Sequence, residues 1–212
     1  MNRQALLNSI LTISCTLPIL FSQNLSSNLA VLAQSTNKVE NHLKNLSFQE
    51  KRNLDRGRVV LKGEKGNYLG RVIASGDLDT AWKVLTDYNN FDRFFPNISS
   101  SKIIEQNGDR IVFQQVNLVD LWLFQEEFTV QIEAIKTKPN KVDFKLVDGE
   151  LKELSGRWSI EEVSPGKILV SHAVEVEPGS DTEKPFFYGI YESSLEETLK
   201  AIAVEITKRS QT

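Results

Sequence analysis

The feature that most restricts the fold of this chain is a run of strand-like segments from Ile98 to Glu177. Turn signals interrupt the run at Asn107-Gly108, Pro139-Asn140, Asp148-Gly149 and Pro165-Gly166. The strands predicted between the breaks span residues 99–106, 110–118, 122–136, 141–147, 151–163 and 167–177. Consecutive strands joined by tight turns form an antiparallel meander, whereas alternating strands and helices would indicate a parallel sheet. The sequence therefore predicts one antiparallel sheet.

A long amphipathic helix is predicted after the last strand, from about Pro185 to Lys208. Its apolar residues recur at spacings of three and four and so share one face. These residues are Phe187, Ile190, Tyr191, Leu195, Leu199, Ile202 and Ile206. A helix of roughly 20 residues is about 30 Å long, which is enough to cross a curved sheet. The sheet and this helix together indicate the α+β class.

Shorter elements precede the meander. Two strand pieces are predicted at residues 58–62 and 68–75. Asp77 then caps a helix over residues 78–87, and Pro96 ends any helix in the turn that follows. This turn is crowded with three aromatic side chains: Phe91, Phe94 and Phe95.

The N-terminus is predicted to be a cleaved signal peptide of residues 1–33. Arg3 is the only early charge, and the segment after it is mostly apolar. Val31 and Ala33 fit the −3 and −1 positions of a signal-peptidase site. The prediction is export to the periplasm or secretion, or to the thylakoid lumen if the source is photosynthetic. An uncleaved anchor and lipid attachment at Cys15 are the alternatives.

The rest of the chain is expected to contain a linker and one domain. Residues 34–56 are expected to form a polar linker and a short helix, which a capping box of Ser47 and Glu50 begins. Residues 57–210 are expected to form the domain. The length of 212 residues, 40% of them hydrophobic, suits a single domain with a sizeable core.

Composition and motif content argue against several classes of function. A net charge of −3 gives no basic surface for nucleic acid. The single cysteine, Cys15, cannot form a disulfide within the chain, and cysteine-based zinc sites lack ligands. The sequence also has no G-x-S-x-G motif, P-loop or dinucleotide-binding spacing. No metal site and no cofactor are predicted.

Several short motifs follow one another along the chain: Val84-Leu-Thr-Asp-Tyr88, Phe95-Pro-Asn97, Gly149, Leu154-Ser-Gly-Arg-Trp158 and Val174-Glu-Val-Glu-Pro178. Their order and spacing resemble the polyketide cyclase/dehydrase and coenzyme-Q-binding START-like family of the SRPBCC superfamily. The resemblance covers about residues 46–208. It implies a helix-grip fold, in which a curved antiparallel sheet wraps around the long C-terminal helix, with a short helix pair near residues 78–95. This architecture usually encloses an apolar cavity, so the resemblance implies a lipid-like ligand.

The residues expected to line such a cavity are the inward-facing apolar side chains and one histidine. They are Trp82, Tyr88, Phe94, Phe95, Phe124, Phe128, Phe144, Leu154, Trp158, Val170, His172, Tyr191 and Leu195. In this fold the core wall is also the pocket wall, so a core role and a ligand role are compatible. The aromatic turn is expected either to belong to the core or to act as a mobile lid. As a lid it would touch the ligand or a membrane through three residues: Phe91, Phe94 and Phe95.

Three titratable residues are weak candidates for catalysis. His172 shares a strand face with apolar residues, so a period of two points it into the interior. It could orient a ligand, act as an acid or base, or be a buried histidine that its neighbours satisfy. Glu126 has an inward position among aromatic residues and could pair with Arg157 or His172, or lie exposed on a bulge. Asp87 either braces the aromatic turn or lines the cavity mouth.

Three functions remain open from the sequence. The favoured one is non-catalytic binding or transport of a hydrophobic small molecule, such as an isoprenoid quinone or another lipid. The second is a cyclase or dehydratase that acts on a polyketide-like chain, which requires at least two titratable groups aimed at one point of the cavity. The third is a protein-interaction module that uses the loop of residues 91–95. The sequence offers one good inward titratable residue, His172, and therefore favours binding.

Overall fold

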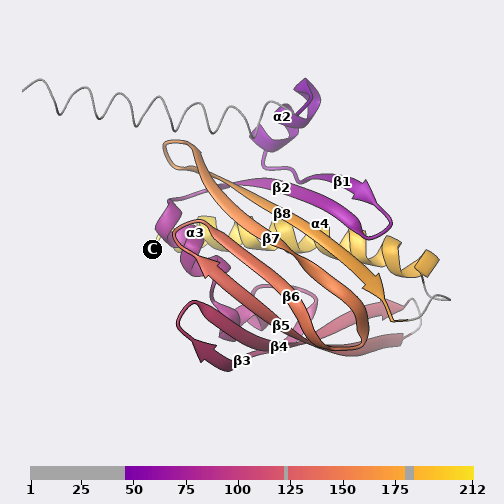
Figure 1. Cartoon of the computed structure of the whole chain (residues 1–212). Coiled ribbons are helices and arrows are strands. Elements are labelled where there is room, and N and C mark those ends of the chain that lie inside the picture. Colours follow the sequence, from indigo (N-terminus) through magenta and orange to yellow (C-terminus); the bar gives the residue numbers. More distant parts are fainter. Residues whose placement is uncertain (1–45, 122–123, 180–183) are drawn as a thin grey trace, which may run out of the picture. The chain divides into compact units, whose positions relative to one another are not determined.

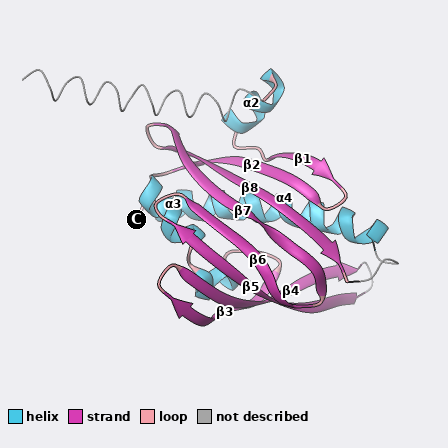
Figure 2. Cartoon of the chain, in the orientation of Figure 1, coloured by secondary structure: helices cyan, strands magenta, loops and turns pink. Residues whose placement is uncertain are grey.

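The structure is a computed structural model that describes residues 46–121, 124–179 and 184–212, with side chains for 46–118, 127–179 and 186–212. Within these residues, eight antiparallel strands form one sheet in the order β1-β2-β8-β7-β6-β5-β4-β3 (Figures 1 and 2). The strands are β1 (Val60–Glu64), β2 (Asn67–Ser75), β3 (Ile98–Asn107), β4 (Arg110–Leu121), β5 (Phe124–Thr137), β6 (Lys141–Gly149), β7 (Leu151–Ser164) and β8 (Lys167–Pro178). The predicted antiparallel meander is confirmed. The predicted signal peptide, the linker before residue 46 and Cys15 lie outside the described residues.

The helices of the described ranges are α2 (Phe48–Asp55), α3 (Leu78–Leu85), the 3-10 helix η1 (Tyr88–Arg93) and α4 (Lys184–Arg209). Helix α4 crosses the concave face of the sheet and packs against β2 and β8 (Figure 1). Gly70 of β2 allows this close approach, because a Cβ at this position would lie 2.2 Å from Cδ1 of Leu199. The helix-grip architecture is therefore confirmed. None of the described helices combines the length and the hydropathy of a membrane span.

Both predicted helix caps are present. Ser47 and Glu50 form a reciprocal capping box at the start of α2, with hydrogen bonds of 3.3 and 2.6 Å. Asp77 accepts a 2.8 Å hydrogen bond from the backbone N–H of Thr80 at the start of α3. Gly57 ends α2 with a φ of 70°, a conformation that costs glycine little because it has no Cβ. Local sequence thus determines where these helices begin and end.

The helix predicted over residues 78–87 ends two residues earlier than expected. The Thr86 hydroxyl donates to the carbonyl oxygen of Trp82 at 2.8 Å, and the chain then tightens into η1. The Asp87 carboxylate accepts a 2.7 Å hydrogen bond from the Asn90 side chain, which stabilises the first turn of η1. The expected pair of short helices is therefore α3 followed by a 3-10 helix.

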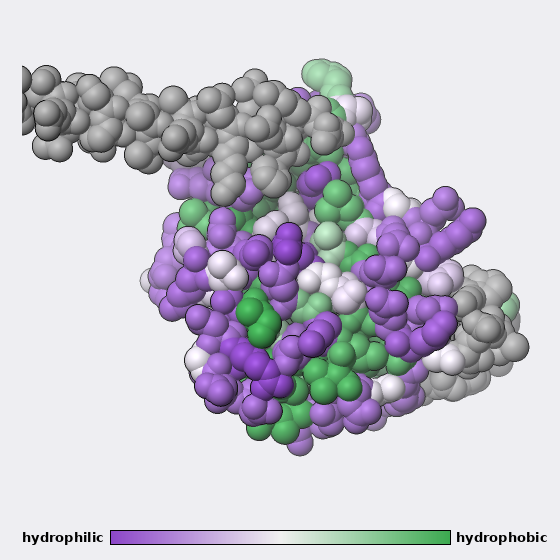
Figure 3. All heavy atoms as spheres, viewed as in Figure 1, coloured by the Kyte–Doolittle hydropathy of each residue, from purple (hydrophilic) through white to green (hydrophobic). Residues whose placement is uncertain are grey.

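Helix α2 packs against the outer face of the sheet. Leu54 of α2 is buried together with Leu46, Val60 of β1 and Leu169 of β8 in a small separate cluster. Leu169 faces outward because the residues on either side of it in β8 face the concave side. The segment that begins at residue 46 is therefore part of the folded unit. The rest of the outer face is mostly hydrophilic with scattered hydrophobic residues (Figure 3).

The concave face has two regions that pack differently. Under the C-terminal half of α4, aliphatic side chains interlock with no exposed surface, and we call this the filled region. Its fully buried residues are Val72, Val84, Ile160, Ile168, Val170, Leu199, Ile202 and Ile206. Toward η1 and β4, the same face borders a cavity, and we call this the cavity region.

Candidate ligand-binding cavity

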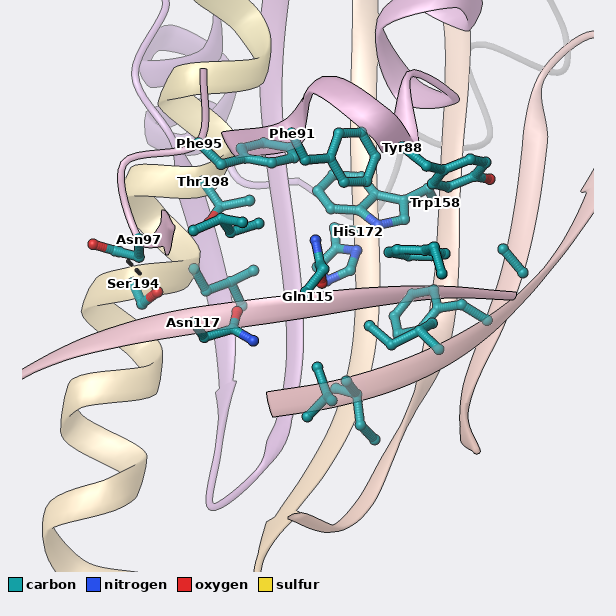
Figure 4. Close-up of a pocket in the computed structure, with 18 of the residues that line it drawn as sticks. Tyr88, Phe91, Phe95, Asn97, Gln115, Asn117, Trp158, His172, Ser194 and Thr198 are labelled. Carbon is teal, nitrogen blue, oxygen red and sulfur yellow. Dashed lines mark hydrogen bonds between the residues drawn. The ribbon is translucent and has the colours of Figure 1, made fainter. Parts of the chain in front are cut away.

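The cavity lies between the concave face of the sheet, one side of α4 and the aromatic turn, and its volume is about 160 Å³ (Figure 4). Its wall consists mainly of apolar side chains, because alternate residues of each strand face the concave side. An engineered protein cavity of roughly 150 Å³ accepts one benzene molecule. The closed cavity is therefore large enough for about one aromatic ring.

The aromatic turn forms the roof of the cavity. Phe91 and Phe95 are buried, with 7% and 6% of their surface exposed, and their rings pack edge to face with centres 5.0 Å apart. Tyr88 stacks on Phe113 of β4 at 4.6 Å. Figure 4 shows Phe91 and Phe95 beside each other over the cavity. In this conformation the turn covers one side of the cavity and presents little of these two rings to solvent.

His172 lies deep inside the cavity region, between two aromatic rings. Its imidazole centre is 3.7 Å from the Trp158 ring and 5.4 Å from the Phe144 ring. Burial lowers the pKa of His172 to about 3, because the charged form would lose its hydration, so the imidazole is neutral at physiological pH. Nδ1 has no hydrogen-bond partner among the described residues. A neutral imidazole with a free nitrogen can bind a ligand, but it is a poor proton donor.

Three further polar side chains reach the cavity. The Tyr88 hydroxyl is buried with no hydrogen-bond partner in the described part of the chain, and burial raises its pKa well above the usual value. On β4, Gln115 is buried, and Nδ2 of Asn117 is buried without a described partner. Figure 4 shows Gln115 and His172 pointing into the same part of the cavity, with Asn117 nearer α4. These groups give an aromatic cavity a set of unused hydrogen-bonding positions.

Gln115 and Asn117 were not predicted from the sequence. Both follow the buried Phe113 at two-residue intervals on β4, so a period of two places them on the inward face. Burial of a polar side chain without a partner is costly. Polar residues at inward strand positions were therefore the signal that could have identified this part of the cavity.

A hydrogen-bonded latch joins the end of the aromatic turn to α4 at the side of the cavity. Nδ2 of Asn97 donates to Oγ of Ser194 at 3.0 Å and to Oε2 of Glu197 at 3.1 Å, and Figure 4 marks the first of these bonds. Asn97, Asn117 and Ser194 are all partly exposed and line the cavity. This side of the cavity wall, next to α4, is therefore polar, whereas most of the remaining lining is apolar.

A second contact ties the start of the aromatic turn to the end of α4. Nη1 of Arg209 lies 2.8 Å from Oδ2 of Asp87, and Nε donates to Oε1 of Glu205 at 2.7 Å. The guanidinium carbon also lies 5.4 Å from the centre of the Phe94 ring. Asp87 and Phe94 are therefore engaged on the outer side of the turn, and neither lines the cavity. Of the two predicted roles of Asp87, the structure supports bracing the turn.

The structure brings most of the predicted cavity residues together. Those that line the cavity are Tyr88, Phe95, Phe128, Phe144, Leu154, Trp158, His172, Tyr191 and Leu195. Trp82, Phe94 and Val170 do not line it. Trp82 and Val170 are instead buried in the adjoining core, because their inward faces meet other side chains there. The side chains of Phe124 and Glu126 lie outside the described residues.

The described lining contains no lysine, arginine, aspartate or glutamate. Within the ranges that the structure describes, no group of three histidine, cysteine or acidic residues could hold a metal ion. The arrangement offers aromatic contacts and neutral hydrogen-bonding groups. It does not bring His172 together with Asp87 as an acid–base pair.

The helix-grip sheet, the covering helix and the internal cavity define a START-like protein. Residues 75–202 match the family of polyketide cyclases/dehydrases and lipid-transport proteins. Because this match spans more than half of the chain, the protein belongs to that family. The recognition made from the motifs is thereby confirmed.

Several known proteins are similar to this chain. A putative polyketide cyclase of Streptomyces halstedii is 21% identical over 108 residues, which are 49% of this chain and 95% of that protein. A structure from Thermus thermophilus has a TM-score of 0.60 at 12% identity and covers 67% of this chain and 97% of its own. The Zhui aromatase/cyclase from Streptomyces sp. R1128 has a TM-score of 0.56 at 15% identity, with coverages of 72% and 94%. A STAR-related lipid transfer protein from Xanthomonas axonopodis has a TM-score of 0.55 at 15% identity, with coverages of 70% and 92%.

These structural similarities show the fold alone, because the identities are low and one fold can carry different functions. The neighbours include both an aromatase/cyclase and a lipid transfer protein by name. The choice between binding and catalysis therefore depends on the cavity of this chain.

Proposed function

We propose that the protein binds or carries a hydrophobic small molecule, such as an isoprenoid quinone or another lipid, without converting it. The observation that carries the proposal is the aromatic cavity, whose polar groups are neutral and whose described lining contains no charged side chain. Family membership supports a ligand-binding role in general.

Burial of apolar surface would provide the affinity. A ring of the size of an aromatic side chain buries roughly 200 Å², which at about 25 cal/mol per Å² contributes about 5 kcal/mol before ordering costs. Such a contribution alone supports weak binding. A longer ligand would add burial by extending past the latch of Asn97, since the closed cavity holds about one ring.

A cyclase or dehydratase is the competing candidate, and the position of His172 inside the cavity is the observation that favours it. That chemistry requires a second acid or base directed at the same point. Asp87 is unsuitable because its carboxylate pairs with Arg209 outside the cavity. Glu126 is the remaining carboxylate to test, so the Glu126→Gln variant belongs in any activity assay.

The aromatic turn is proposed to act as a lid during ligand transfer. Phe91 and Phe95 face the cavity in the closed conformation, so a membrane or a protein partner would meet these rings only after the turn opens. Export to the periplasm, to the medium or to a thylakoid lumen remains a proposal that the N-terminal sequence supports. A carrier in such a compartment would move an apolar compound through water.

The test is native mass spectrometry of the protein purified from a lipid-containing host, followed by organic extraction of the bound compound. The expected result is a co-purifying apolar compound at one equivalent, recovered chemically unchanged after incubation. An Ala134→Leu variant, which places a larger side chain in the cavity wall, should lose the compound. Ala173→Leu on the exposed face of β8 is the matched control and should retain it.

Two outcomes would contradict the proposal. An empty protein that also takes up no quinone or prenyl lipid would exclude the carrier function. Recovery of a cyclised or dehydrated product from a supplied polyketide-like compound, lost in Glu126→Gln, would support the enzyme instead.

A further inference from the structure

Some of the unpaired buried polar atoms belong to residues that line the cavity. Among the described residues, the buried side-chain atoms without a hydrogen bond include the Tyr88 hydroxyl, Nδ2 of Asn117 and Nδ1 of His172, and all three residues line the cavity. An unsatisfied buried polar group costs about 1–3 kcal/mol. The three groups, from η1, β4 and β8, belong to residues of one cavity wall, so a ligand that reached them would remove this cost.

The chemistry of these groups restricts the ligand. The amides of Asn117 and Gln115 and the protonated phenol of Tyr88 can all donate hydrogen bonds. Carbonyl, ether and hydroxyl oxygens can accept such bonds without carrying a charge. Trp158 and Phe144 flank the same space with flat rings, next to His172. A ring that bears at least one accepting oxygen therefore fits both the apolar and the polar parts of the wall.

The same wall disfavours a charged ligand. The described lining has no basic residue to pair with a carboxylate and no acidic residue to pair with an amine. Moving an unpaired ion from water into such a site costs several kcal/mol. Ionised fatty acids and other charged lipids would meet this cost without compensation.

We propose that the cavity selects an uncharged ring compound with hydrogen-bond-accepting oxygen, and that Gln115 and Asn117 of β4 are the residues that determine this specificity. The inference rests on the proposed binding function and makes its ligand class specific. The two side chains occupy alternate positions on the inward face, roughly 7 Å apart along the strand. Gln115 lies toward His172 and Asn117 toward α4 (Figure 4), so the two side chains would contact different parts of one ligand.

Three probe compounds of similar shape separate the contributions of apolar contact, neutral oxygen and charge to the affinity. These are 2,3-dimethylnaphthalene, which is apolar, 2,3-dimethyl-1,4-naphthoquinone, which adds two neutral oxygens, and 2-naphthoate, which adds a charge. Methyl groups occupy both reactive ring positions of the quinone, so it does not alkylate Cys15. Equilibrium dialysis with the full chain should give at least tenfold tighter binding of the quinone than of the hydrocarbon. The naphthoate should bind more weakly than the hydrocarbon.

Variants of β4 then assign the preference to named residues. Gln115→Leu and Asn117→Leu should each reduce the quinone-to-hydrocarbon affinity ratio several-fold while the hydrocarbon still binds, which also shows that the cavity is intact. Gln114→Leu is the matched control, because Gln114 is adjacent in sequence, does not line the cavity and should leave the ratio unchanged.

The outcomes distinguish this inference from the proposed function. If quinone and hydrocarbon bind equally well, or if the naphthoate binds most tightly, the inference is wrong and the binding function stands. If none of the three probes binds, both fail. If the quinone-to-hydrocarbon affinity ratio changes equally in Gln114→Leu and Gln115→Leu, the inward residues of β4 do not determine the specificity.

Discussion

The filled region and the cavity region lie on the same concave face and under the same helix, but their side chains differ. In the filled region, aliphatic residues of β2, β7, β8 and α4 interlock without exposed surface. In the cavity region, aromatic rings stack on one another, and polar atoms lack partners. The filled region is packed as densely as protein interiors usually are, whereas the cavity region leaves space beside its rings. Tight packing and open space therefore belong to different parts of one core.

The largest expected difference concerns two leucines of α4, one in each region. Leu199→Ala should lower the free energy of unfolding by about 2–5 kcal/mol, because the tightly packed surroundings of Leu199 cannot collapse into the new space. Leu195→Ala should cost less, because Leu195 already borders the cavity and makes fewer contacts to lose. Urea unfolding followed by circular dichroism measures both values.

The same two leucines also test whether the ligand binds in the cavity region. Leu195→Ala should change the affinity for an apolar ring compound, while Leu199→Ala should leave it unchanged where the protein is folded. Equal losses of stability in the two variants would show that the cavity region is packed as tightly as the filled region. The division of the core would then be wrong.

The next largest effect is a pH dependence of the free energy of unfolding, which His172 of the cavity region causes. His172 has a pKa of about 3 in the folded protein and about 6.5 when unfolded. Between these values the unfolded state binds a proton that the folded state does not, so stability falls as the pH falls below 6.5. The slope from this group is about 1.4 kcal/mol per pH unit.

A His172→Phe variant isolates this slope, because it keeps an aromatic ring beside Trp158 but cannot take up a proton. From pH 6 to pH 4, the wild type should lose about 2–3 kcal/mol more free energy of unfolding than the variant loses. Every other titrating group, including His42, is common to both chains and cancels. Parallel stability curves for the two proteins would mean that His172 is hydrated and charges normally.

The smallest effect on stability is expected at the two polar contacts that join the aromatic turn to α4. Asn97→Ala removes the bonds to Ser194 and Glu197, and Arg209→Gln removes the ion pair with Asp87. Because these groups are partly exposed, each change should cost less than about 1 kcal/mol of stability. Release of a bound ring compound should nevertheless become faster, by up to about fivefold, since a loss of 1 kcal/mol corresponds to a factor of about five.

Stopped-flow dissociation of a fluorescent hydrocarbon measures the release rate. Lys83→Gln is the control, because it breaks the exposed Asp79–Lys83 pair on α3 and lies away from the cavity lining. Unchanged release in both Asn97→Ala and Arg209→Gln would show that ligands enter by another route than between the aromatic turn and α4.

Many residues of the cavity wall could be predicted from the sequence, but the boundary between the cavity region and the filled region could not. His172 was identified because inward strand positions follow directly from a period of two. The same rule also selected Val170, which is fully buried in the filled region. The two-residue alternation along a strand shows which side of the sheet a side chain faces. It gives no information about the side chains that lie opposite on other elements.

The sequence by itself determined the antiparallel meander, the caps of α2 and α3 and the amphipathic face of α4. Each of these depends on local spacing, turn residues and backbone hydrogen bonds, which a single chain segment specifies. Only the tertiary structure decided that Phe91 and Phe95 roof a cavity, that Asp87 pairs with Arg209 and that Gln115 and Asn117 face unused space. These features depend on residues up to 122 positions apart meeting across the fold, and close packing of distant side chains cannot be deduced from their spacing along the chain.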